Sequence, residues 1–376
     1  MRKPASFLLA ALCMTSLTLL SAEPLVFISA FASGEKAGIH AFSFDSKTGA
    51  LRPLHRTTGI QNPFFLAVSP DQRFLYAINA EKFGGADDEF VAAYALERNS
   101  GQLKRLNQQS ARGTASCYLD VDATGKTVAV ANYASGSVAS LPVKEDGSLG
   151  EAASFVQHSG SGADPARQKG PNAHSIVFSP DNRFALAADL GIDKILVYQL
   201  DAATSKLTPN EAQPFVKMQP ASGPRHITFH PNGRHVYVIN ELANTVTCFD
   251  YAAASGTLAE RQTISTLPTG FTGKSYTADL KITPDGSFLY GTNRGHDSIA
   301  SYRIAADGTL SLLSIDPSLG KGPQNLLITP DGQWLLCANM PGNSVIVFRI
   351  DATSGKITST GAPMEMPMPS CIRWVK

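Results

Sequence analysis

The stretch GPRHITFHPNGRHVYVIN, residues 223–240, is one of six copies of a unit that reads as strand, turn and strand. The other copies are NPFFLAVSPDQRFLYAIN (62–79), TASCYLDVDATGKTVAVAN (114–132), NAHSIVFSPDNRFALAAD (172–189), YTADLKITPDGSFLYGTN (276–293) and GPQNLLITPDGQWLLCAN (322–339). Their turns lie 46 to 57 residues apart, which is the spacing of a four-stranded repeat. The repeat therefore predicts an all-β fold, a β-propeller.

Each copy is followed by two further strand-like runs joined by a turn, such as KILVYQLDAATSKL at residues 194–207. Alternating apolar residues around a short turn indicate a β-hairpin. At the ends of the chain, residues 25–31, 39–45 and 51–55 resemble second, third and fourth strands, and residues 369–376 resemble a first strand. We expect them to form a seventh blade, in which the N- and C-terminal strands pair and close the ring.

Length and composition are compatible with one large globular domain. The chain has 376 residues, of which 43% are hydrophobic and 17% are charged, too few charges for a disordered chain. Because the repeat runs nearly from end to end, we expect a single toroidal domain over residues 23–376 rather than several separate domains. The sequence carries no signal for an oligomeric state.

The first 22 residues, MRKPASFLLAALCMTSLTLLSA, combine a short basic start, an apolar run and small residues. This pattern predicts a signal peptide over residues 1–22 and an exported protein, periplasmic or extracellular. An uncleaved anchor is the alternative, although the run is shorter than the ~20 residues of a membrane span. Cleavage would change the formal net charge from +1 to −1. We therefore expect neither nucleic acid nor membrane as a partner of the mature chain.

Four cysteines remain after residue 22: Cys117, Cys248, Cys337 and Cys371. Each lies inside a strand-like run, and none has the close spacing of zinc ligands. We expect buried thiols, with no disulfide bridge.

Four ionisable residues stand at equivalent positions of three consecutive repeats. In a propeller, the start of the first strand and the end of the second strand of each blade lie at the same face. His174 and Arg225 begin first strands, whereas Glu241 and Arg294 follow second strands. We expect all four at one mouth of the central channel, where they would be the catalytic residues.

Further residues are expected to bind the substrate around this mouth: His226 and Asp279, one place along their strands, His296, and Arg167 and Gln168. The last two belong to a polar insertion at residues 156–170, which we expect to form a rim or lid. One glutamate beside two arginines disfavours a metal ion, and we expect no cofactor. The alternative is an ion-pair network that only fills the wet mouth.

Several segments of the chain resemble one known family. PNAHSIVFSPD, GPRHITFHP, NELANTVTCF and ITPDGSFLYGTNRGHDSI are similar to segments of the seven-bladed propeller lactonases, which include 6-phosphogluconolactonases and the carboxy-cis,cis-muconate cyclase. The resemblance covers nearly the whole mature chain. It implies a site made of His174, Arg225, Glu241 and Arg294. The chain departs from the family pattern at Asn172, where a histidine is frequent, and at Asp279, where a glutamate is frequent.

The leading hypothesis is therefore a 6-phosphogluconolactonase-like hydrolase acting on an anionic sugar lactone. The arginines would hold the carboxylate or phosphate and stabilise the oxyanion, with His174 or Glu241 as the general base. Two alternatives remain open. One is a muconate-type cycloisomerase, and the other is a propeller that binds a ligand or partner without catalysis.

Overall fold

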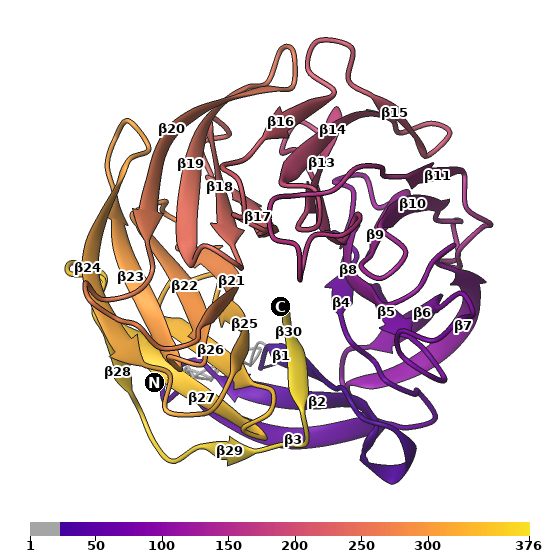
Figure 1. Ribbon diagram of the computed structural model, residues 1–376. Coiled ribbons are helices and arrows are strands. Elements are labelled where there is room, and N and C mark those ends of the chain that lie inside the picture. The colour runs from indigo at the N-terminus through magenta and orange to yellow at the C-terminus, as the bar shows by residue number, and fades with distance from the viewer. Residues whose placement is uncertain (1–22) are drawn as a thin grey trace, which may run out of the picture.

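The computed structural model describes residues 23–376 and forms a ring of seven β-sheets around a central channel (Figure 1). The predicted seven-bladed propeller is confirmed. The predicted signal peptide, residues 1–22, lies outside the described residues. Within the described part, no helix is long and apolar enough to cross a bilayer.

The blades are numbered along the chain, with the innermost strand given first. Blade one contains β4 (Leu66–Val68), β5 (Phe74–Asn79), β6 (Phe90–Glu97) and β7 (Gln102–Ser110). Blade two contains β8 (Ser116–Val121), β9 (Thr127–Asn132), β10 (Ser137–Pro142) and β11 (Ser154–Gln157). Blade three contains β12 (Ala173–Phe178), β13 (Phe184–Asp189), β14 (Lys194–Asp201), β15 (Lys206–Pro209) and β16 (Phe215–Lys217).

Blade four contains β17 (Pro224–Phe229), β18 (His235–Asn240), β19 (Thr245–Ala252) and β20 (Thr257–Ser265). Blade five contains β21 (Tyr276–Ile282), β22 (Phe288–Arg294), β23 (Ser298–Ile304) and β24 (Leu310–Pro317). Blade six contains β25 (Pro323–Ile328), β26 (Trp334–Asn339), β27 (Ser344–Ile350), β28 (Ile357–Ser359) and β29 (Met364–Glu365). Blade seven contains β30 (Pro369–Val375), β1 (Leu25–Ala30), β2 (Gly38–Asp45) and β3 (Ala50–Thr57), with a short 3₁₀ helix, η1 (Gly34–Lys36), before β2.

Blade seven is closed by the two ends of the chain, as predicted. β30 pairs antiparallel with β1, from Leu25 opposite Val375 to Ala30 opposite Pro369. In Figure 1 the yellow C-terminal strand lies beside the indigo N-terminal strands near the channel. This pairing satisfies the backbone groups of β1 that would otherwise form an open sheet edge. The ring is therefore held closed by hydrogen bonds within one sheet.

The apolar core lies between neighbouring blades. The second strands β9, β13, β18 and β26 are buried at every position, which explains why they read as short continuous apolar runs. A tyrosine on several second strands also donates a hydrogen bond to a hairpin glycine of the next blade. These pairs are Tyr76 with Gly147, Tyr237 with Gly308 and Tyr290 with Gly355, at 3.2, 2.7 and 2.8 Å. Such buried hydroxyl donors fix the blades to one another.

The predicted insertion begins two residues later than expected, and the cysteines are placed as expected. Val156 and Gln157, at the start of the predicted insertion, belong to strand β11, so the connection to β12 spans residues 158–172. The four cysteines are free and buried, which confirms the prediction of buried thiols.

Candidate active site

The first strands of blades two to seven each carry a β-bulge near their start. In blade three, Ala173 pairs with Asp189 and Ser175 with Ala188, which leaves His174 as the extra residue. Arg225 is the extra residue of blade four in the same way. A bulge bends its strand and redirects the inserted side chain. The bulges therefore aim His174 and Arg225 at the channel end that we call the mouth, where first strands begin and second strands end.

Glu241 is the centre of the mouth on blades three to five. Its Oε1 accepts a hydrogen bond from Arg167 Nη2 at 2.7 Å. Its Oε2 accepts from Arg225 Nε at 3.0 Å and from Arg294 Nη2 at 2.6 Å, and lies 3.8 Å from His174 Nε2. The other three residues that the sequence grouped, His174, Arg225 and Arg294, thus lie around the Glu241 carboxylate, together with Arg167. We refer to these five residues as the Glu241 cluster.

The charge of Glu241 is fixed by its surroundings. Burial favours the neutral acid, but the charges of Arg294 and then Arg225 outweigh burial and hold the pKa of Glu241 well below its usual range. A carboxylate that holds no proton at neutral pH and is paired with three arginines is a weak base. Its hydrogen bonds hold the three arginines at the mouth.

His174 is the neutral member of the cluster. Burial, followed by the charge of Arg225, lowers the pKa of His174 well below its usual value. Its Nδ1 lies 3.5 Å from Sγ of Cys117, whose thiol also lies 3.3 Å from the carbonyl oxygen of His174. A neutral imidazole has one nitrogen without a proton, which can accept one, and Nε2 of His174 is the nitrogen that faces Glu241 at the mouth.

Arg225 is held from two sides. Its Nε binds Glu241, and its Nη1 donates to the carbonyl oxygen of Ala278 at 2.5 Å and to His226 Nε2 at 3.0 Å. Among residues 23–376, its Nη2 has no hydrogen-bond partner. Burial, with the charge of Arg294 as the next cause, lowers the pKa of Arg225 to about 10, so the guanidinium is protonated at neutral pH. The free Nη2 is therefore a charged donor at the mouth.

Arg294 and Arg167 form the outer part of the cluster, with side chains 26% and 33% exposed. Arg294 also donates to the backbone carbonyl of Thr277 at 2.9 Å. Arg167 reaches the cluster from the connection at residues 158–172. The neighbouring Gln168 does not face the mouth: it is 1% exposed, and its side chain bonds Leu190, Asp193 and Asp164. The contacts of Gln168 fix the loop that presents Arg167.

One carboxylate, that of Asp189, binds both ends of the connection at residues 158–172. The sequence does not identify Asp189 as a site residue. Oδ2 of Asp189 lies 2.6 Å from Nδ1 of His158, and its Oδ1 accepts from the backbone N–H of Asn172 at 2.7 Å. Nε2 of His158 lies 2.9 Å from the hydroxyl of Tyr198. The sequence feature that could have drawn attention to Asp189 is that the other repeats have an asparagine at this position, the end of the second strand.

The remaining expected residues lie at different depths. His226 and Asp279 are buried below the cluster and bonded to each other at 2.8 Å. His296 contacts other groups: its Nδ1 is 2.7 Å from Ser298 Oγ, and its ring packs edge-on against Phe271. Tyr133, which is not among the predicted site residues, contacts both Arg167 and the His174 ring. The sequence could have indicated Tyr133, because it directly follows the second strand β9, just as Glu241 directly follows the second strand β18.

A cluster of aromatic side chains lies at the mouth on blades seven and one. Phe31 and Met340 follow the second strands β1 and β26 there, and Phe64 precedes β4. The rings of Phe31, Phe64 and Phe83 pack with centroids 4.9, 5.0 and 5.2 Å apart. Phe31, Phe83 and Met340 are only partly buried. The mouth therefore joins a charged half to an aromatic half.

The chain is similar to known proteins over nearly its whole length. It matches the model described as Lactonase, 7-bladed beta-propeller over residues 25–374. The chain belongs to this lactonase family. It is 34% identical over 351 residues to a Bacillus subtilis protein named 6-phosphogluconolactonase, covering 93% of this chain and 97% of the relative. A Formosa agariphila protein of the same name is 33% identical over 307 residues, covering 80% of this chain and 85% of the relative.

A solved structure also resembles this lactonase-family chain. The periplasmic gluconolactonase of Pseudomonas aeruginosa superposes with a TM-score of 0.88 at 32% identity, covering 94% of this chain and 99% of that one. The two chains therefore share the whole propeller.

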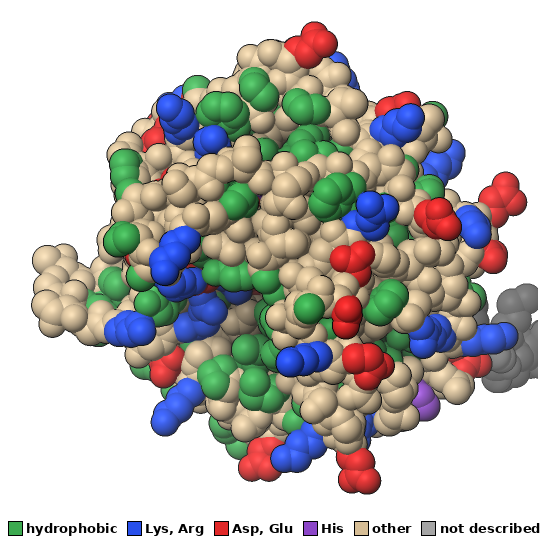
Figure 2. Space-filling model, turned by 45° about the vertical axis from the view of Figure 1, so that its right-hand side comes forward, with side chains coloured by type: hydrophobic (Ala, Val, Ile, Leu, Met, Phe, Trp, Pro, Cys, Tyr) green, Lys and Arg blue, Asp and Glu red, His purple; other side chains and the backbone are tan. Residues whose placement is uncertain are grey.

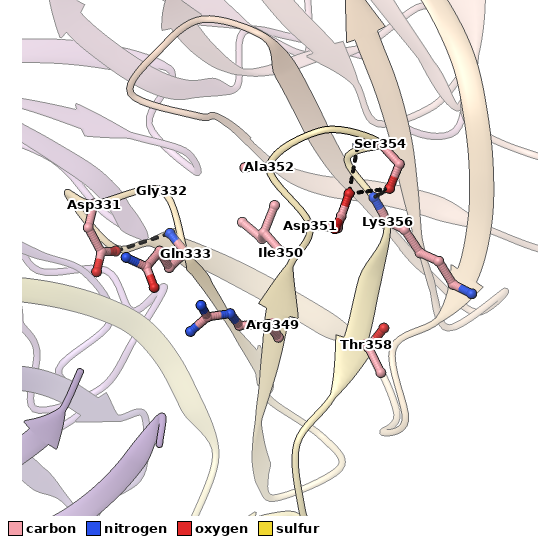
Figure 3. A pocket seen from close by; sticks show the side chains of 10 residues that line it. All are labelled: Asp331, Gly332, Gln333, Arg349, Ile350, Asp351, Ala352, Ser354, Lys356 and Thr358. Atoms are coloured by element: carbon pink, nitrogen blue, oxygen red, sulfur yellow. Dashed lines mark hydrogen bonds between the residues drawn. The ribbon is translucent and has the colours of Figure 1, made fainter. Parts of the chain in front are cut away.

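Other surface features of this lactonase-family chain lie away from the Glu241 cluster. A cleft of about 820 Å³ lies at the opposite face, between turns of blade six (Figure 3). There Asp331 and Asp351 accept hydrogen bonds within their own turns, which indicates a structural role.

Within residues 23–376, no group of three or more His, Cys, Asp or Glu side chains is placed to hold a metal ion. On the face shown in Figure 2, basic and acidic side chains are interspersed.

Proposed function

We propose that this chain hydrolyses an anionic sugar lactone at the Glu241 cluster. The observation that carries this proposal is a neutral His174 beside a carboxylate that binds three arginines, all at one channel mouth. Membership of the lactonase family supports it, as do the relatives named 6-phosphogluconolactonase. No observation favours the cycloisomerase.

His174 is the general base in this proposal, and Glu241 is its electrostatic partner. Both oxygens of Glu241 accept hydrogen bonds from arginines, whereas Nε2 of His174 lies at the mouth on a neutral ring. Arg225 supplies the free Nη2 donor, and the more exposed Arg294 and Arg167 bind the carboxylate or phosphate of the substrate. Gln168 and His296 are expected from the sequence to bind the substrate, but their side chains contact other parts of the protein, so in this proposal they stabilise the neighbouring loops instead.

The proposed reaction begins when water attacks the lactone carbonyl carbon and gives a proton to Nε2 of His174. Negative charge develops on the carbonyl oxygen, where Nη2 of Arg225 donates a hydrogen bond. The bond between the carbonyl carbon and the ring oxygen then breaks. The imidazolium returns its proton to the ring oxygen, which completes the hydroxy acid.

The aromatic half of the mouth complements this chemistry. A sugar lactone ring has polar edges and a face of C–H groups, which packs well on aromatic side chains. Phe31, Phe64 and Phe83 offer such a surface beside the arginines. A charged half and an aromatic half would together fix which face of the ring meets the water.

Export is part of the proposal, because the N-terminal segment has the pattern of a signal peptide. The similar Pseudomonas aeruginosa protein is titled a periplasmic gluconolactonase. Phosphorylated sugars are mainly cytoplasmic, so export favours an unphosphorylated sugar lactone over 6-phosphogluconolactone.

A lactone panel tests the proposed function. The panel contains sugar lactones that carry a carboxylate, such as glucarolactone, beside the uncharged gluconolactone. Purified residues 23–376 should hydrolyse an anionic lactone of the panel, at equal rates with and without a chelator. Protection of the fold by a lactone with no turnover of any panel member would instead indicate the non-catalytic propeller.

The role of His174 gives a prediction about pH. Because the pKa of His174 lies well below 6.5, the base is unprotonated near neutrality and kcat/KM should stay level as the pH falls toward 6. The acid limb should appear only below the ordinary histidine pKa. His174→Gln should lower kcat by about a hundredfold or more, whereas His55→Gln, in the outer strand β3, should not. An acid limb centred near pH 6.5 that survives in His174→Gln would assign the base elsewhere.

A further inference from the structure

A buried imidazole and a buried carboxylate lie one step deeper in the channel than Arg225. His226 is 3% exposed and Asp279 is 1% exposed. Nδ1 of His226 lies 2.8 Å from Oδ1 of Asp279, and its Nε2 lies 3.0 Å from Nη1 of Arg225. The imidazole therefore connects an anion of blade five to a cation of blade four.

Asp279 is surrounded by donors on both oxygens. Oδ2 accepts from Asn325 Nδ2 at 2.7 Å, from the backbone N–H of Leu326 at 2.9 Å and from Lys281 Nζ at 2.7 Å. Oδ1 accepts from Lys281 Nζ at 2.8 Å as well as from His226. Burial opposes ionisation, but the charge of Lys281 and the contact with His226 hold the pKa of Asp279 well below its usual range. Asp279 is thus an ionised acceptor.

The tautomer of His226 is fixed from both sides. A carboxylate only accepts hydrogen bonds, so Nδ1 must carry the proton. A guanidinium only donates, so Nε2 must be the bare acceptor for Nη1 of Arg225. Burial, followed by the charge of Arg225, lowers the pKa of His226 to about 3, which keeps the ring neutral. Tyr118 and Phe65 pack edge-on against the ring, with centroids at 4.9 and 5.9 Å.

We propose that His226 and Asp279 are positioning residues for Arg225, rather than groups that contact the substrate. Asp279 sets the tautomer of His226, and Nε2 of His226 holds Nη1 of Arg225. Together with Glu241 on Nε, this leaves Nη2 as the nitrogen available to the substrate. The kinetic consequence rests on the proposed lactonase function, whereas the tautomer does not.

Asp279→Asn is the decisive variant, because the surroundings dictate how the amide must sit. Three donors converge on Oδ2, one of them the backbone N–H of Leu326, so the amide oxygen must take that place. The amide NH₂ then faces Nδ1 of His226 and forces the proton onto Nε2. Nε2–H would oppose the N–H of Arg225 Nη1 and displace the guanidinium.

The tautomer is measured by NMR on the folded protein with ¹⁵N-labelled histidine, with the His226 signals assigned from their loss in His226→Gln. We expect a protonated Nδ1 and a bare Nε2 in the wild type, and the reverse in Asp279→Asn. In parallel, kcat for a lactone should fall about tenfold or more in Asp279→Asn. Asp250→Asn is the matched control, because it makes the same change beside another histidine, His235 at 3.2 Å, away from the mouth. The control should keep both the tautomer and the rate.

The outcomes separate the two proposals. A wild-type His226 with its proton on Nε2 overturns the inference, even if Asp279→Asn does not fold. So does an Asp279→Asn variant that reverses the tautomer and keeps the wild-type kcat. If the wild type hydrolyses no lactone, the proposed function fails, while the wild-type spectrum still decides whether the positioning arrangement exists.

Discussion

Arg225→Ala is expected to lower kcat for sugar-lactone hydrolysis by about a hundredfold or more. Removal of one preorganised donor from a developing oxyanion costs about 3 kcal/mol in the transition state. Arg225 is 1% exposed, and its Nη2 is free of protein partners among residues 23–376. The measurement is steady-state kinetics on protein shown to be folded by circular dichroism.

Two variants make the Arg225 experiment specific. Arg349→Ala removes an arginine that lines the cleft at the opposite face (Figure 3) and should leave kcat unchanged. There its guanidinium lies over the ring of Trp334. Arg225→Lys keeps the charge but cannot reproduce the fork that binds Glu241 and His226 together, so its kcat should lie between those of wild type and Arg225→Ala. Folded Arg225→Ala with kcat within threefold of wild type would remove Arg225 from the mechanism.

Glu241→Gln is expected to lower the free energy of unfolding by about 3 to 5 kcal/mol at pH 7. Removal of one partner of a buried ion pair leaves the other charges uncompensated. Here a carboxylate that is 5% exposed binds Arg167, Arg225 and Arg294. Urea unfolding measures the difference, with Glu151→Gln, an exposed carboxylate, as the control.

The sign of the pH dependence follows from the depressed pKa of Glu241. The contribution of Glu241 to stability is fully present above its unfolded pKa of about 4.3 and is lost as the pH falls toward the folded pKa. The gap in stability between wild type and Glu241→Gln should therefore narrow below about pH 4. A gap that is absent at pH 7, or that widens in acid, would show that the ion pairs do not stabilise the fold.

The sequence predicts the propeller well because the repeat is visible at two levels. The turn spacing sets the blade, and the polar residue that ends each second strand, such as Asn240, fixes the register of the copies. The chain ends predict how the ring closes. Residues 25–31 resemble a second strand and residues 369–376 resemble a first strand, and these two strands pair within each blade. Local pattern and global fold agree in these segments.

The candidate site is predicted only in part. Blade equivalence selects His174, Arg225, Glu241 and Arg294, because their direction depends on strand position. It does not predict the contacts of Gln168, whose side chain turns into the loop that it stabilises.

The same limit applies to pairs of residues in the channel. The tie between His158 and Asp189 joins a loop to a strand 31 residues away, and the pair of His226 and Asp279 spans two blades. Such contacts depend on bulges and on the closed ring, which no local pattern encodes.

A structure with bound product tests the placement of the reaction most directly. Crystals of residues 23–376 soaked with gluconate or 6-phosphogluconate should show the acid at the mouth, with an anionic group within hydrogen-bond distance of Arg225, Arg294 or Arg167 and the carbon chain against Phe31 and Phe64. Product bound only elsewhere, such as in the cleft beside Arg349 and Lys356, with the mouth unoccupied, would contradict catalysis at the Glu241 cluster.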